Sequence, residues 1–179
     1  MVRIFTGHHC DMCGNITDIN IIARKIYMPP DETDARLLTE LQKNAHLTAA
    51  ELGDMLALSP SQAGRRRQRL EMDGYITSYG AKLDAQRLGL TVQGFVQVQM
   101  ATHNIKAAKS FASLITLRPE VISAWTLTGE ADYLLHVYCA DLAALNIFIQ
   151  EVLLPHPAVA RVQSQIVMNE LKAAAPLPT

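Results

Sequence analysis

The chain has 179 residues, of which 49% are hydrophobic and 18% are charged, so it can form one globular domain or two small ones and is not intrinsically disordered. Sixteen basic and 17 acidic side chains give a formal net charge of -1, which excludes a uniformly basic nucleic-acid coat. No apolar run approaches the roughly 20 residues that cross a bilayer, and no signal-like segment is recognisable. We expect a cytoplasmic protein that does not contact membranes.

The first 27 residues differ in pattern from the rest of the chain. The segment from His8 to Cys13 contains metal-ligand side chains, but no second Cys or His pair follows, so we expect neither a metal site nor redox activity there. Because every recognisable element lies after Met28, we treat residues 1–30 as an N-terminal extension. The hypothesis is that the extension is not native and that translation begins at Met28.

Three helices are predicted between residues 31 and 74. The acid-rich stretch 31–34 suits a helix N-terminus and is followed by leucines at helical spacing. Thr48 and Glu51 form a capping box for a second, short helix. Residues 59–62, Ser-Pro-Ser-Gln, offer a cap, a proline at the first helical position and a glutamine three residues after the cap, so they begin a third helix that stops at Gly74.

Two short extended pieces, 75–79 and 81–84, flank Gly80 and predict a hairpin. Three helices followed by a hairpin indicate a winged helix-turn-helix DNA-binding domain over residues 31–84. Residues 85–91 are expected to be a linker.

The third predicted helix carries a stripe of cationic side chains. At about 100° per residue, Gln62, Arg65, Arg66 and Arg69 fall on one face. Arginine pairs bidentately with guanine edges or phosphates, and glutamine pairs with adenine. An isolated run of arginines is more often a solvated face, but the capped helices around it favour a reading helix in the major groove. The candidate DNA contacts are Ser59, Ser61, Gln62, Arg65, Arg66, Arg69 and Lys82.

Two residues of this helix do not fit the stripe. Arg67 falls beside the packed flank, so it must reach solvent or pair with an acid such as Asp54 or Glu71. Gly64 weakens the helix by about 1 kcal/mol relative to alanine, unless DNA or the second helix approaches it closely.

From residue 91 onward the pattern alternates between strands and helices. Strands are predicted at 91–100, 121–128, 133–139 and 159–168, with a helix over 105–117 and another that Asp141 caps. The order strand, helix, strand, strand, helix, strand is the ferredoxin-like motif, here over residues 92–172. The fold class is therefore α+β, and the tail, 173–179, is expected to fray.

The central strands of this second domain are apolar on both faces. Tyr133, Leu135 and Val137 lie on one side, and Leu134 and Tyr138 lie on the other. Two helices cover only one face of a sheet, so the second face is expected to be buried against another subunit. A twofold homodimer would present two reading helices to a pseudo-palindromic DNA site.

A glycine turn separates the second and third predicted strands. Gly129 can take a positive φ and leave backbone N–H groups for a carboxylate, and Asp132 is a natural partner for an ammonium group. A plain glycine turn with a capping aspartate is the competing interpretation.

The order of motifs resembles the leucine-responsive regulator (Lrp/AsnC) family of transcription factors. The resemblance runs from Asp31 to Leu177 and depends on five stretches: Asp34-Ala-Arg-Leu-Leu, Leu58-Ser-Pro-Ser with the following Arg69-Leu-Glu, Gly74-Tyr-Ile, Leu83-Asp84 with Leu88-Gly89-Leu90, and Gly129-Glu-Ala-Asp-Tyr133-Leu-Leu. Arg67 departs from the family's usual aliphatic residue. The resemblance implies an effector-binding and oligomerisation domain, dimers that associate into octamers, and an amino-acid effector held by Thr128, Gly129, Glu130, Asp132 and Tyr133.

Other chemistry is not supported by the sequence. There is no phosphate loop, nucleophile elbow or carboxylate pair at a catalytic spacing, so we expect no enzyme, no catalytic residue and no cofactor. A stand-alone amino-acid sensor or scaffold, and an enzyme built on the ferredoxin-like half, are the alternatives. The arginine stripe argues against both. The prediction is a sequence-specific, double-stranded DNA-binding transcriptional regulator controlled by a small effector.

Overall fold

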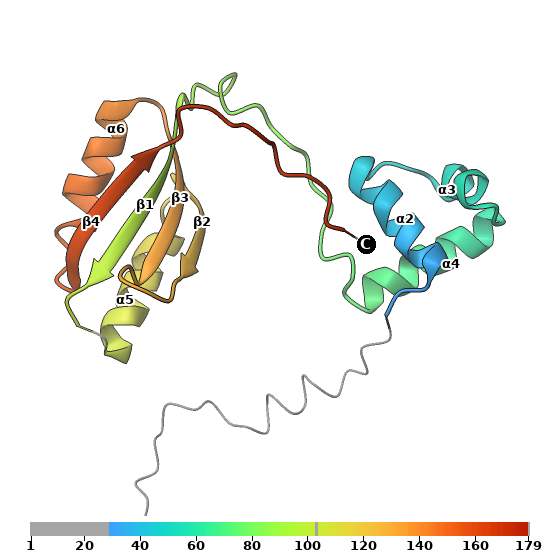
Figure 1. Ribbon diagram of the computed structural model, residues 1–179, viewed down its shortest axis with the longest axis horizontal. Helices are drawn as coiled ribbons and strands as arrows, with labels where there is room; N and C mark the ends of the chain where they lie inside the picture. The colour runs from blue at the N-terminus through green and yellow to red at the C-terminus, as the bar shows by residue number, and fades with distance from the viewer. Residues whose placement is uncertain (1–28, 103, 179) are drawn as a thin grey trace, which may run out of the picture. The chain divides into compact units, whose positions relative to one another are not determined.

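The computed structural model describes residues 29–102 and 104–178, which form two units (Figure 1). The first unit ends at Gly80 and also takes in the chain from Pro176, and the second spans Ala81–Ala175. Among the residues described, no helix is both long and apolar enough to span a bilayer. The His8–Cys13 segment lies outside the described residues.

Three helices build the first unit: α2 (Glu32–Lys43), α3 (Ala49–Leu56) and α4 (Pro60–Met72). Both predicted capping boxes are confirmed, with Thr48 and Glu51 at the start of α3 and Ser59 and Gln62 at the start of α4. The core contains apolar residues of all three helices: Leu37, Leu38, Leu41, Leu52, Leu56, Ala63 and Leu70. Local caps thus begin the helices, and leucines at helical spacing hold them together.

The turn between α3 and α4 is tight. Ala57 ends α3 in the left-handed region at φ 55°, and the Leu58 N–H donates to the Gly53 carbonyl at 2.9 Å. A Cβ atom on Gly53 would lie 2.7 Å from the Leu58 carbonyl oxygen, so only glycine fits there without a backbone shift. This turn fixes the direction in which α4 leaves α3.

The predicted hairpin after α4 is wrong for this chain, because residues 76–84 carry no strand. Gly74 ends the helix at φ 80°, and the N–H groups of Tyr75 and Ile76 both donate to the Leu70 carbonyl. Tyr79 then returns to α4, where its hydroxyl donates to Glu71. These bonds hold the segment against the helix instead of pairing it across Gly80.

The second unit has the predicted ferredoxin-like order. Its strands are β1 (Val92–Met100), β2 (Val121–Thr126), β3 (Tyr133–Cys139) and β4 (Val159–Ile166). Its helices are α5 (Ile105–Thr116) and α6 (Leu142–Ile147), and α6 continues as a π-helix, η1 (Phe148–Leu153). The sheet is antiparallel with the spatial order β2-β3-β1-β4 (Figure 1).

The helices of the second unit cover one face of its sheet. Phe111 of α5 and Phe148 of η1 pack with the buried strand residues Val96, Leu135 and Val137. The register places Phe95 opposite His136, and their rings stack at 4.7 Å between centroids. We call the other face, which carries Phe95, Trp125, Leu134, His136 and Tyr138, the open face.

The C-terminal tail does not simply fray, contrary to the prediction for residues 173–179. The Leu177 backbone is bound to the Gln42 side chain on α2 by two hydrogen bonds. The last described residues therefore belong to the first unit, although the rest of the tail follows the second.

Candidate nucleic-acid interface and effector loop

The outward face of α4 is polar. Ser61, Arg65 and Gln68 are exposed, whereas Ala63 and Leu70 on the opposite side are buried. Sequence reasoning missed Gln68, although its position, three residues after Arg65, places both on one face of a helix. An exposed side chain of this length on a reading helix can reach a base edge.

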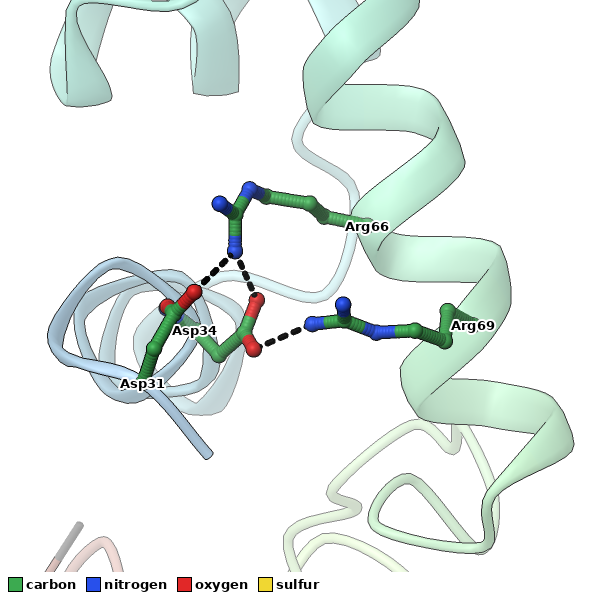
Figure 2. Close-up of polar contacts among 4 residues, drawn as sticks. All are labelled: Asp31, Asp34, Arg66 and Arg69. Carbon is green, nitrogen blue, oxygen red and sulfur yellow. Dashed lines mark hydrogen bonds and ion pairs between the residues drawn. The ribbon is translucent and has the colours of Figure 1, made fainter. Parts of the chain in front are cut away.

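Arg66 and Arg69 turn toward α2 instead of outward (Figure 2). Arg66 Nη1 lies 2.7 Å from both Asp31 Oδ2 and Asp34 Oδ1, and Arg69 Nη2 donates to Asp34 Oδ2. The Asp34 side chain is only 3% exposed. A buried carboxylate needs cationic partners, so the two arginines neutralise it and join α2 to α4.

The ion pairs change the charge balance of this face. The Arg66 guanidinium holds the pKa of Asp31 below its usual value, and Asp31 and Asp34 raise the pKa of Arg66. Two carboxylates and two guanidiniums together carry no net charge. Arg65, which has no ion pair at 4.0 Å or closer among the described residues, is the cation of the predicted stripe that this cluster leaves uncompensated.

Ser59 and Gln62 serve the start of α4. The Ser59 hydroxyl accepts from the Gln62 N–H at 3.3 Å, and Gln62 Oε1 accepts from the Ser59 N–H at 3.0 Å. Bidentate pairing with adenine needs both amide atoms of a glutamine. While the capping box is closed, Gln62 has only its NH₂ group for such a contact.

Arg67 lies outside the predicted arginine stripe, as its position on the helix predicts. It pairs with Glu71, one of the two expected acids, at 3.1 Å, and donates to the Leu47 carbonyl at 2.9 Å. Its guanidinium also lies 4.8 Å from the centre of the Tyr79 ring. These contacts make Arg67 part of the packing between α4 and the segment that follows it.

The side chains of the stripe line one shallow hollow. Gln62, Arg65, Arg66 and Arg69 meet with Leu58 around a space of about 330 Å³. The structure therefore brings together four of the predicted DNA contacts, which are Gln62, Arg65, Arg66 and Arg69. Lys82 is exposed and belongs to the second unit, outside this hollow.

The predicted effector loop joins β2 to β3. Gly129 has φ 120°, as expected for a turn that needs glycine, and Thr128, Gly129 and Glu130 are exposed. Asp132 Oδ2 accepts from the Met100 N–H at 2.7 Å, and the Asp132 N–H donates to the Val98 carbonyl at 3.0 Å. Asp132 thus anchors the loop to β1, a structural contact that the sequence did not indicate.

Two hollows adjoin the loop. Glu130 and Arg161 line a small polar hollow of about 30 Å³, with three glutamines of β1 and β4. Tyr133 lines a mostly apolar pocket of about 200 Å³ between α5 and the β2–β3 pair, and its ring packs 4.8 Å from that of Phe111. Arg161 was not predicted; only the β1–β4 register brings it opposite Gln99.

Comparison with protein families agrees with this architecture. Residues 30–77 match a winged helix-turn-helix DNA-binding model, and residues 93–177 match the Lrp/AsnC ligand-binding domain.

Relatives match over most of the chain. The DNA-binding transcriptional activator DecR of Escherichia coli is 30% identical over 148 residues, 83% of this chain and 97% of DecR. The Bkd operon transcriptional regulator of Pseudomonas aeruginosa is 34% identical over 149 residues, 82% of this chain and 97% of that protein.

A solved structure resembles the fold closely. The crystal structure of a transcriptional regulator from Neisseria meningitidis in complex with L-methionine has a TM-score of 0.79 and 38% identity, covering 83% of this chain and 96% of that one. The relatives are regulators of transcription, so we assign no enzymatic activity. The chain belongs to the Lrp/AsnC family and is a DNA-binding transcriptional regulator with a ligand-binding domain.

Proposed function

We propose that α4 reads DNA in the major groove through Ser61, Arg65 and Gln68, and that Arg66 and Arg69 hold the helix in place while their outer N–H groups face phosphates. The observation that carries this proposal is the division of the arginine stripe: Arg65 is exposed and uncompensated, whereas its two neighbours are bound to Asp34. Ser59, Gln62 and Lys82 are secondary contacts, the first two through the N-terminal end of α4.

The experiment is fluorescence anisotropy of the intact protein with DNA that flanks its own gene, against scrambled DNA of equal length. Selective binding in the nanomolar range supports the proposal, since specific protein–DNA affinities are about 10⁻⁸ to 10⁻¹¹ M. Equal affinity for both DNAs at physiological salt would contradict it.

A homodimer formed through the open face completes the proposed regulator, and octamers formed from such dimers are its larger assembly. Trp125 is 47% exposed, and Phe95, Leu134, His136 and Tyr138 on the same face are only half-buried in the single chain. Aromatic side chains of this kind dominate the energetics of protein interfaces. A twofold axis through the sheets would also supply the second reading helix that a palindromic site needs.

We expect the dimer to weaken as the pH falls from 7.5 to 5.5. Burial already lowers the pKa of His136 in the single chain, and a partner that covers the open face would remove more water from the imidazole and lower it further. The separated chains would bind protons more readily than the dimer, so the dimer dissociation constant should rise as the pH falls through the ordinary histidine range and below it. Because a twofold dimer holds two copies of His136, the full rise is about hundredfold for each unit by which dimerisation lowers the pKa of His136.

Sedimentation equilibrium at both pH values measures this effect. His136→Gln should remove the pH dependence, whereas His46→Gln, an exposed histidine of the first unit, should leave it unchanged. A dissociation constant that is equal at both pH values for the native chain would contradict the role of His136.

We also infer that the ligand of the second unit is an amino acid bound at the β2–β3 loop. The residues around Gly129 are exposed and Gly129 has a positive φ, which suits N–H groups that face a carboxylate. The nearby Glu130 and Arg161 have opposite charges, as an ammonium and a carboxylate require. Thr128 and Tyr133 flank the loop, and Asp132 holds it in place. The L-methionine bound to the Neisseria relative supports this class of ligand.

Titration with the common amino acids, L-methionine included, should change the emission of Trp125, the chain's single tryptophan. A true effector at 100 times its dissociation constant should also stabilise the fold by about 2.7 kcal/mol. Glu130→Gln should weaken the response, and Glu151→Gln, an exposed acid on η1, should not. If no amino acid alters emission or thermal stability, this part of the proposal fails.

A further inference from the structure

Gln42 on α2 binds the backbone of a residue 135 positions further along the chain. Its Nε2 donates to the Leu177 carbonyl at 3.1 Å, and its Oε1 accepts from the Leu177 N–H at 2.6 Å. A side-chain amide presents a donor and an acceptor side by side, and these match both backbone groups of one extended residue. Gln42 therefore binds the backbone of the tail and not the Leu177 side chain, which remains 75% exposed.

The tail is suited to this contact by its composition. Prolines stand on both sides of Leu177, at positions 176 and 178. Proline has no N–H group, so Leu177 carries the one N–H donor of the Pro-Leu-Pro segment, and Gln42 uses it. A residue before proline is restricted to extended conformations, and the segment loses little entropy when it is fixed.

A groove in the first unit surrounds the contact. It has a volume of about 630 Å³ and lies between α2 and the segment Tyr75–Gly80, with Leu38, Leu41, Tyr75 and Tyr79 in its walls. Leu177 and Pro178 line the same groove. Grooves lined by aromatic side chains are a common receptor for proline-containing extended segments.

We propose that this groove is the docking site of the chain's own Pro176-Leu177-Pro178 segment. The chain leaves the first unit after Gly80 and returns to it at Pro176, so the docked tail gives the second unit a second attachment to the first. When the tail is released, the two units are joined only by the chain that follows Gly80.

Amide resonances of the ¹⁵N-labelled full chain, compared with those of a chain ending at Ala175, test the docking. Truncation should shift the Gln42 side-chain amide and the signals of Thr77–Gly80 and leave the fold otherwise intact. An acetylated Ala-Ala-Pro-Leu-Pro-Thr peptide should reverse these shifts at about millimolar concentration. Unchanged signals on truncation would overturn the proposal.

Two comparisons isolate the hydrogen bonds. A peptide with N-methylated leucine lacks the donor and should bind about five- to tenfold more weakly. Gln42→Ala should abolish the effect of the peptide on the truncated chain, whereas Lys43→Ala, one position along α2, should keep it. Equal binding by both peptides would show that Gln42 does not recognise the tail.

A mixed sample separates docking within one chain from exchange between chains. Labelled truncated chain is mixed with unlabelled full-length Gln42→Ala chain, whose tail is intact, and both are kept far below the millimolar concentration at which the free peptide binds. The labelled groove should remain empty. Recovery of the native signals would mean that a second copy supplies the tail and would overturn docking within one chain.

Discussion

Arg65→Ala is expected to lower the affinity for specific DNA by about 5- to 150-fold, which corresponds to the loss of roughly 1 to 3 kcal/mol expected for one base-reading arginine. Arg65 is exposed at the centre of the outward face of α4 and makes no ion pair among the described residues. Its removal should leave thermal stability within about 0.5 kcal/mol of the native value, as for other exposed sites.

Arg66→Ala should behave differently, because Arg66 is bound to Asp31 and Asp34. Its loss removes a phosphate-facing cation and leaves carboxylates nearer the DNA, so we expect weaker binding to every sequence and a salt slope smaller by about 1. Thermal stability should also fall, by about 1 kcal/mol after allowance for the partial exposure of the arginine.

Anisotropy at several salt concentrations separates these two roles. Arg65→Lys keeps the charge but not the planar donor fork, so it should retain the salt slope and lose sequence preference. Arg36→Ala, an exposed arginine of α2, serves as the control for net charge. If Arg65→Ala binds specific DNA as tightly as the native chain, the reading face is wrongly assigned.

Gly53→Ala is expected to destabilise the DNA-binding unit by about 2 kcal/mol, although alanine favours a helix over glycine by about 1 kcal/mol. The new Cβ atom would lie 2.7 Å from the Leu58 carbonyl oxygen and 3.3 Å from the Pro60 nitrogen. Both are backbone atoms, so the turn itself must move. α4 would then change its angle to α3.

Gly64→Ala is the matched control for this substitution. A Cβ atom on Gly64 meets nothing closer than the Ala49 Cβ at 3.7 Å, an ordinary contact, so this variant should gain up to about 1 kcal/mol. Scanning calorimetry with hydrogen exchange in the first unit measures both. Equal stability changes for the two glycines would contradict the steric role of the turn.

The starts of the helices could be predicted because their signals are local. The capping partners Thr48 and Glu51, and Ser59 and Gln62, lie three residues apart, so the sequence alone specifies their contacts. β1 was predictable for a similar reason, since its one buried face imposes a two-residue period.

Contacts between distant residues were not predictable in this way. Asp34 lies 32 residues before Arg66, and helical spacing alone does not show that Arg66 faces α2. The expected hairpin depended on extended propensity around Gly80, but the bond from Tyr79 to Glu71 binds that segment to α4 instead. Gln42 and Leu177, 135 residues apart, gave no sequence signal at all.

The Asp34 ion pairs separate two properties that a DNA-reading helix usually combines. Arg66 and Arg69 hold α4 to α2, whereas Ser61, Arg65 and Gln68 are exposed. Substitutions at those exposed positions cost the fold little. If these three side chains read the bases as we propose, the regulator can be retargeted to a new operator by changing them, without a compensating mutation elsewhere in the domain.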